Sequence, residues 1–147
     1  MIATYNKKKA EKDHVPALLI ERGIRPTRQR LVLATLLFDG MHKHVTAEDV
    51  LAMVRRRRER VSLATVYNTL HQFTKCGLLN EVNVDQARSY FDTNVSAHYH
   101  FYDEETGKLT DIPLDSIQTE CLPSAPDGRL VSRVDVTIRL KKKEVEA

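Results

Sequence analysis

Residues 62–75 read SLATVYNTLHQFTK, and this stretch decides the fold. Leu63, Val66, Leu70 and Phe73 recur at helical spacing, so they predict one apolar face of a helix that Ser62 caps. The opposite face is predicted to consist of Ala64, Thr65, Asn68, His71, Gln72 and Lys75, with Tyr67 on the border. A helix with one apolar and one polar face can rest on other helices and enter the major groove of DNA.

The segments around this helix complete a winged helix-turn-helix pattern over residues 14–92. Apolar spacing predicts helices at 14–22 and 27–38, and Thr46 caps a third helix that runs into an arginine-rich stretch. Two alternating runs, 79–84 and 89–92, predict a hairpin directly after the 62–75 helix. Short helices followed by a hairpin are typical of a winged helix.

The pattern changes after residue 92. Residues 97–102 and 108–112 predict strands, 114–121 a helix, and the alternating run 130–140 a further strand. The fold class expected is therefore α+β, an N-terminal winged helix-turn-helix followed by a small C-terminal α/β dimerisation and sensing domain at 93–140. A flexible basic arm (1–13) and a basic tail (141–147) flank the two.

Charge and composition narrow the function. The 147 residues carry a net charge of +3, divided into +6 over 1–92 and −3 over 93–147. The basic front half suits double-stranded DNA. Residues 93–147 are too few to bury a large hydrophobic core alone, which favours a homodimer. No apolar run is long enough to cross a membrane, no signal peptide is evident, and the two cysteines fit a reducing cytoplasm.

Two kinds of side chain are expected to contact DNA. Thr65 and Asn68 are well placed for base edges, and asparagine can pair with adenine through two hydrogen bonds. Phosphate contacts and affinity are expected from Arg25, Arg28, Arg30 and the arginine run at 55–60, which includes Arg57. Taken alone, the arginine run fits a solvated charged surface equally well.

A histidine-rich group indicates a metal site. His98 and His100 leave the same face of a predicted strand, because strand side chains alternate. Asp92 could add a carboxylate, and His44 lies just before the third helix. Such a set suits a divalent ion, although an HxH pair is also a common surface feature of strands. The sequence contains no CxxC pair, which excludes a thiolate zinc knuckle.

Three segments resemble the Fur (ferric uptake regulator) family of bacterial metal-responsive repressors. They are GIRPTRQR at 23–30, HVTAED at 44–49 and SLATVYNTL at 62–70. The resemblance implies a winged helix joined to a dimerisation domain, and a regulatory metal site at His44, Asp92, His98 and His100. It also implies that Arg25 reaches the minor groove and that Tyr67 contacts bases. The complete DNA-binding set expected is Arg25, Arg28, Arg57, Ser62, Ala64, Thr65, Tyr67 and Asn68.

The chain departs from the family pattern at its other metal sites. Asp103 and Thr106 stand at the CxxC positions of the structural zinc site, so no such site is expected. Ala97, Tyr99 and Gln118 replace ligands of a second site. These losses resemble the Irr (iron response regulator) branch, which implies haem as a ligand of His98 and His100. The Cys-Pro haem motif of some Irr-like members is absent, since residues 24–26 read Ile-Arg-Pro.

The sequence therefore predicts a homodimeric, cytoplasmic bacterial repressor of iron and haem homeostasis genes. Its affinity for a pseudo-palindromic operator would depend on haem, on one divalent metal (Zn, Fe or Mn) per subunit, or on both. Two alternatives are a metal-dependent enzyme with a 2-His-carboxylate site and a DNA-binding structural protein without a ligand.

Overall fold

The computed structural model describes residues 14–118 and 120–145. They divide into two compact units, the first ending at Val95 and the second beginning at Ser96. The predicted arm at 1–13 and the last two residues of the predicted tail lie outside the described residues. In the part of the chain that is described, no helix is both long and apolar enough to cross a membrane.

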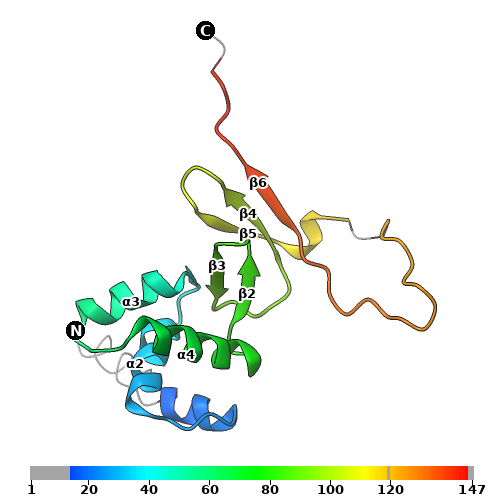
Figure 1. The fold of residues 1–147 in the computed structure, drawn as a ribbon. Helices are drawn as coiled ribbons and strands as arrows, with labels where there is room; N and C mark the ends of the chain where they lie inside the picture. The colour runs from blue at the N-terminus through cyan, green and yellow to red at the C-terminus, as the bar shows by residue number, and fades with distance from the viewer. Residues whose placement is uncertain (1–13, 119, 146–147) are drawn as a thin grey trace, which may run out of the picture. The chain divides into compact units, whose positions relative to one another are not determined.

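Helices open the first unit (Figure 1). A helical segment at 14–21 precedes α2 (Arg28–Leu37), α3 (Ala47–Arg56) and α4 (Leu63–Lys75). Thr46 caps α3 in a capping box with Asp49. The Asp49 backbone N–H donates to the Thr46 hydroxyl at 3.1 Å, and the Asp49 carboxylate accepts the Thr46 backbone N–H at 2.9 Å. Ser62 caps α4. Both predicted caps are therefore confirmed.

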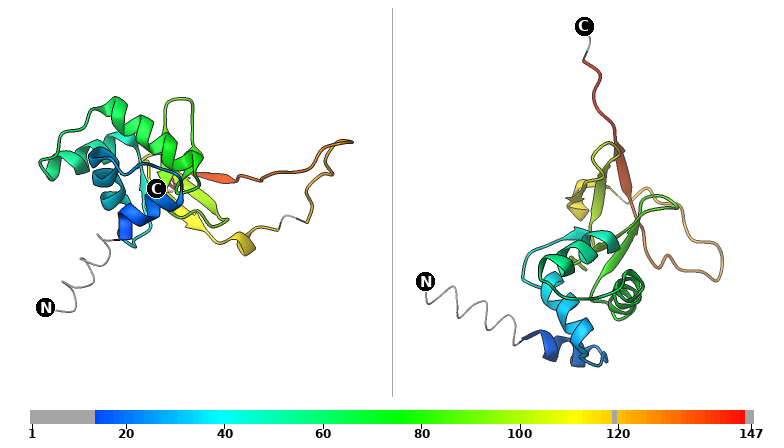
Figure 2. Two further views of the ribbon diagram at one scale, coloured as in Figure 1. Left: turned by 90° about the horizontal axis from the view of Figure 1, so that it is seen from below. Right: turned by 60° about the vertical axis from the view of Figure 1, so that its left-hand side comes forward.

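The helices share one apolar core, and Figure 2 shows them clustered in two further views. Fully buried side chains include Leu19, Leu33, Leu37, Val50, Val54, Val66, Leu70, Phe73 and Phe91. Leu63 was expected in this core but is 38% exposed. It is the first residue of α4, and helical side chains point back toward the N-terminus, so Leu63 has no preceding turn to cover.

A three-stranded antiparallel sheet completes the first unit in the order β1-β3-β2. Its strands are β1 (His44–Val45), β2 (Asn80–Asn83) and β3 (Ser89–Asp92). The predicted hairpin is thus present as β2 and β3, and β1 adds a short strand to its edge. Helices followed by this sheet form the predicted winged helix-turn-helix.

The second unit is built on a second three-stranded sheet. Its strands are β4 (Tyr99–Asp103), β5 (Leu109–Ile112) and β6 (Thr137–Leu140), and a 3-10 turn, η1 (Leu114–Ser116), follows β5. In the order β5-β4-β6, β4 runs antiparallel to β5 and parallel to β6. Tyr99, Tyr102, Leu109 and Ile112 are its buried hydrophobic side chains.

Two predictions for this unit were wrong. Among the described residues of the helix expected at 114–121, only η1 is helical; Leu114 is 47% exposed, and short helices need packing to persist. The strand expected at 130–140 is limited to β6. A strand requires a neighbour, and β4 supplies one only from His100, opposite Thr137, to Asp103, opposite Leu140.

Candidate functional site

The exposed face of α4 carries side chains predicted to read DNA. Ala64 and Asn68 are exposed, whereas Val66, Leu70 and Phe73 are fully buried against the core. The helix is therefore held by one face and presents the other to solvent, which is the arrangement that a major groove requires. Base contacts by these residues remain a prediction.

The first turn of α4 is fixed by its own hydroxyl groups. Ser62 Oγ accepts a hydrogen bond from the Thr65 backbone N–H at 3.1 Å and donates to Thr65 Oγ1 at 2.9 Å. Ser62 is exposed and Thr65 is half-buried. The two hydroxyls expected to face DNA are thus held in place at the helix N-terminus.

Tyr67 lies on the border between the two faces, as the sequence predicted, and is 37% exposed. Its phenol donates a hydrogen bond to Glu48 Oε1 of α3 at 3.1 Å, and this bond raises the pKa of the Tyr67 phenol. Sequence reasoning missed Glu48. Only the packing of α3 against α4 brings the two side chains together.

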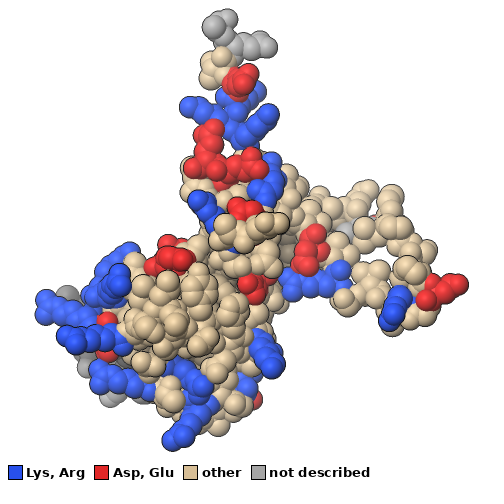
Figure 3. Space-filling model, in the orientation of Figure 1, with Lys and Arg blue, Asp and Glu red and all other residues tan. Residues whose placement is uncertain are grey.

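Three arginines of the predicted DNA-binding set are exposed, whereas Arg30 is half-buried. Arg25 and Arg57 lie on the surface, and Arg28 forms an ion pair of 3.1 Å with Glu59 while remaining 84% exposed. Figure 3 shows Lys and Arg side chains gathered around the helical unit on the face drawn. An exposed pair of this kind holds its arginine weakly, so Arg28 can exchange Glu59 for a phosphate.

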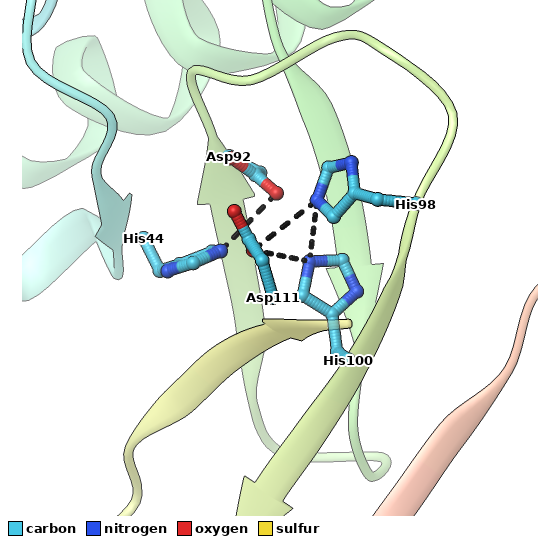
Figure 4. A group of neighbouring side chains, drawn as sticks. All are labelled: His44, Asp92, His98, His100 and Asp111. Atoms are coloured by element: carbon cyan, nitrogen blue, oxygen red, sulfur yellow. Dashed lines mark hydrogen bonds and ion pairs between the residues drawn. The ribbon is translucent and has the colours of Figure 1, made fainter. Parts of the chain in front are cut away.

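One pair of candidate metal ligands lies in the first unit (Figure 4). His44 of β1 stands opposite Asp92 of β3 in the sheet register, and His44 Nε2 lies 3.2 Å from Asp92 Oδ2. The Asp92 side chain is fully buried, and its Oδ1 accepts the Asn94 backbone N–H at 2.8 Å. The short strand β1 therefore places an imidazole beside a buried carboxylate.

A second group lies in the second unit and consists of His98, His100 and Asp111 (Figure 4). The two imidazole Nε2 atoms are 2.9 Å apart, and Asp111 Oδ1 lies 3.3 Å from that of His98 and 3.5 Å from that of His100. Both histidine side chains are less than one-tenth exposed. Two nitrogens and one carboxylate oxygen thus converge on one point.

A backbone contact orients His98 for coordination. His98 Nδ1 lies 2.6 Å from the Ser96 carbonyl oxygen, which can only accept, so Nδ1 carries the proton. In the neutral ring Nε2 then holds the lone pair, and Nε2 is the atom that faces His100 and Asp111. Histidines that bind metals are commonly fixed in this way. The donor set of this group fits a borderline divalent cation such as Zn²⁺, Fe²⁺ or Mn²⁺.

Asp111 was not among the predicted ligands. It stands directly opposite His100 in the β4–β5 register, and cross-strand neighbours project from the same face. The signal was present in the predicted strands at 97–102 and 108–112, but the register of the hairpin was needed to see it.

At the CxxC positions of the family, the chain builds a polar turn. Asp103 Oδ1 accepts the backbone N–H groups of Glu105 at 2.9 Å and Thr106 at 3.2 Å. These bonds lower the pKa of the Asp103 carboxyl. The turn between β4 and β5 is therefore closed by a carboxylate, an arrangement that Asp residues often adopt.

Comparison with known proteins places these features in context. The profile of the Ferric uptake regulator family matches residues 21–129. The Peroxide operon regulator of Bacillus subtilis (strain 168) is 39% identical over 93 residues, 63% of this chain and 63% of that protein. The Peroxide-responsive repressor PerR of Staphylococcus aureus (strain Mu50 / ATCC 700699) is 35% identical over 95 residues, 65% of this chain and 64% of that protein. This chain therefore matches a little under two-thirds of the length of each relative.

One solved structure shares the fold of this chain over nearly the whole length of the solved protein. The ferric uptake regulator from Pseudomonas aeruginosa, solved with manganese, has 26% sequence identity and a TM-score of 0.69. The match covers 88% of this chain and 98% of that one. The predicted α+β fold class is confirmed.

Proposed function

Because this chain belongs to the ferric uptake regulator family, we propose that it is a homodimeric transcription regulator whose affinity for operator DNA depends on a bound divalent metal. Regulators, not enzymes, make up the family and its matched relatives. This finding confirms the non-enzymatic prediction and removes the alternative of a metal-dependent enzyme.

The group formed by His98, His100 and Asp111 carries the proposal. Its two Nε2 atoms and one carboxylate oxygen lie within 3.5 Å of one another, with both imidazoles nearly buried. Burial of the two imidazoles is costly unless their nitrogens have partners, and a cation would satisfy both together with the Asp111 carboxylate, whose side chain is 35% exposed.

We assign His44 and Asp92 to the same ion. Asp92 and His98 are six residues apart, which limits their Cα separation to about 20 Å even in a fully extended chain. A divalent cation held by ligands from both units would link them. Such a link favours one arrangement of the winged helix relative to the dimerisation domain, and it couples metal binding to DNA binding.

Two finer assignments of the signal follow from different observations. The relatives named for peroxide support peroxide as the signal that releases the operator. The resemblance to the Irr branch supports haem, with the imidazoles of His98 and His100 as axial ligands. The visible absorption spectrum of the protein distinguishes the two signals. Haem binding changes this spectrum, whereas a response to peroxide requires no haem.

The test is operator binding by the full chain, first freed of metal by chelation. We expect Mn²⁺, Zn²⁺ or anaerobic Fe²⁺ to raise the affinity for a selected pseudo-palindromic operator by about 10-fold or more, within the usual range of allosteric coupling. Hydrogen peroxide added to the Fe²⁺ form, or haem added to either form, then identifies the signal. If no metal changes the affinity for the operator, the result would support the alternative of a DNA-binding structural protein without a ligand.

Variants locate the sensor. The double change His98→Ala/His100→Ala should abolish tight metal binding in calorimetry, and Asp111→Ala should weaken it by about 10-fold or more. The matched control is His42→Ala, an exposed histidine two residues from His44. A double variant that keeps wild-type metal and signal responses would place the sensor elsewhere.

A further inference from the structure

Tyr67 and Glu48 form an exposed pair beside the DNA-facing side of α4. Glu48 lies in the first turn of α3, and its Oε1 accepts the Tyr67 phenol proton across 3.1 Å. Both residues are exposed, so no core packing requires the contact. A carboxylate in the first turn of a helix interacts favourably with the helix dipole, which accounts for the presence of Glu48 but not for its contact with Tyr67. An exposed carboxylate also repels DNA phosphates.

The Tyr67 ring is held from a second direction. His71, one turn further along α4, stacks on it with ring centroids 6.3 Å apart and an interplanar angle of 20°. His71 in turn packs edge-on against the buried Phe91 of β3, with centroids 5.6 Å apart. The Tyr67 side chain is thus held by Glu48 from α3 and by His71 from α4, and His71 itself packs against β3.

The hydrogen bond determines what the Tyr67 oxygen can offer to a ligand. A phenol has one proton, and Glu48 accepts it, so only the lone pairs of the Tyr67 oxygen remain for another partner. The carboxylate of Glu48 is likewise an acceptor without a proton. The raised pKa of the Tyr67 phenol fits a proton that stays on the oxygen at neutral pH. The pair therefore presents hydrogen-bond acceptors only.

We propose that Glu48 determines base specificity by fixing Tyr67 as a hydrogen-bond acceptor toward DNA. In the major groove, adenine N6 and cytosine N4 carry donors, whereas thymine O4 and guanine O6 are acceptors. An acceptor-only pair favours adenine or cytosine at the contacted position and disfavours thymine or guanine. The inference rests on the proposed function, because it requires that α4 bind DNA.

The experiment is selection of binding sites from a randomised duplex library by the full chain with Mn²⁺. We expect wild type to prefer adenine or cytosine at one position by roughly 5- to 150-fold, the span of a good base contact. Tyr67→Phe should remove the preference at that position and leave the preferences at the other positions unchanged. Glu48→Ala should relax it toward thymine or guanine, because the released phenol can donate. The matched control Glu21→Gln removes the same charge from an exposed position in the 14–21 helix and should leave the preference unchanged.

The outcomes separate the two claims. If wild type selects no sequence, the proposed function fails and this inference fails with it. If wild type selects an operator and Glu48→Ala selects the same bases at every position, the specificity role of Glu48 alone is overturned.

A readout without DNA tests the contact itself. Alkaline titration of tyrosine absorbance, taken as wild type minus Tyr67→Phe, isolates the Tyr67 phenol among the five tyrosines. We expect its midpoint to lie above the ordinary value and to fall toward it in Glu48→Gln. A midpoint that is the same with and without Glu48 would show that the carboxylate does not hold the phenol proton, and would overturn the inference.

Discussion

At the scale of single residues, Arg58 is a conformational exception. Its φ of 57° makes it the one non-glycine residue in the left-handed region among the residues described. It follows the C-cap of α3, where its N–H donates to the Arg55 carbonyl at 3.0 Å. The equivalent position after α4 is Gly77, with a φ of 81°. A side chain is strained in this conformation, whereas glycine adopts it freely.

Arg58→Gly should stabilise the protein. Glycine removes the side-chain clash of the left-handed conformation, and the larger entropy of the unfolded chain offsets part of that gain, so we expect a net increase of about 0.5 kcal/mol in the free energy of unfolding. Urea unfolding measures it. Arg56→Gly removes the same charge from within α3 and should instead destabilise by about 0.5–1 kcal/mol. Equal effects of the two changes would contradict the strain at Arg58.

At the scale of elements, α4 and the end of α3 are predicted to have separable roles in DNA binding. The α4 face presents Asn68, whose amide can recognise a base edge, whereas the arginines at the end of α3 present charge alone. Base contacts distinguish sequences, and phosphate contacts do not.

Asn68→Ala should weaken binding to the selected operator by ~1–3 kcal/mol and binding to random DNA far less. Arg57→Ala should weaken both and lower the slope of log affinity against log salt by about one. Fluorescence anisotropy at several salt concentrations measures both effects. Equal losses on the two DNAs for Asn68→Ala would refute its role in base reading.

The β4–β5 turn makes a prediction about acid stability. Hydrogen bonds from the backbone N–H groups of Thr106 and Glu105 lower the pKa of Asp103 below its ordinary 3.8. A carboxyl whose pKa is lower in the folded state stabilises the fold above its unfolded pKa, and this contribution disappears as the pH falls through the folded pKa.

Asp103→Asn keeps an oxygen that can accept both bonds but removes the charge. We expect wild type to be more stable than Asp103→Asn at pH 7. The difference in stability between the two proteins should disappear as the pH drops below 3.8. Thermal unfolding across this range measures the difference. A difference that does not change with pH would show that the charge of Asp103 contributes nothing.

At the scale of the whole molecule, we expect the second unit to pair with a second copy of the chain. Its buried hydrophobic residues are few, while Leu130, Val131, Ile138 and Leu140 are between 38% and 94% exposed. β6 lies at the edge of its sheet, and exposed apolar edge strands readily pair with another chain. A second copy that covers β6 and the preceding segment would bury these side chains.

The full chain with Ile138→Lys and Leu140→Lys should therefore be a weaker dimer, because a lysine ammonium is costly to bury. Light scattering over a concentration series should show the molar mass fall from two chains toward one. Met41→Lys, at a position 70% exposed in the first unit, is the control and should leave the dimer unchanged. If both proteins dimerise equally, the interface lies away from β6.

The sequence by itself determined the features that depend on local chemistry. The caps at Thr46 and Ser62, the apolar face of α4 and the β2–β3 hairpin all follow from spacing and turn residues, which act over a few positions. The pairing of His98 with His100 was also predicted from their spacing, although the strand expected at 97–102 begins only at Tyr99, so that His98 lies just before β4.

Only the tertiary structure decided the features that depend on which segments become neighbours. Asp111 joins the two histidines through the register of β4 and β5, and Glu48 reaches Tyr67 through the packing of α3 on α4. The strand predicted over 130–140 shortened to β6 because its backbone finds a neighbour in β4 over four residues only. Register, helix packing and strand pairing join residues far apart in the chain, and the periodicity of one segment carries no information about its partner.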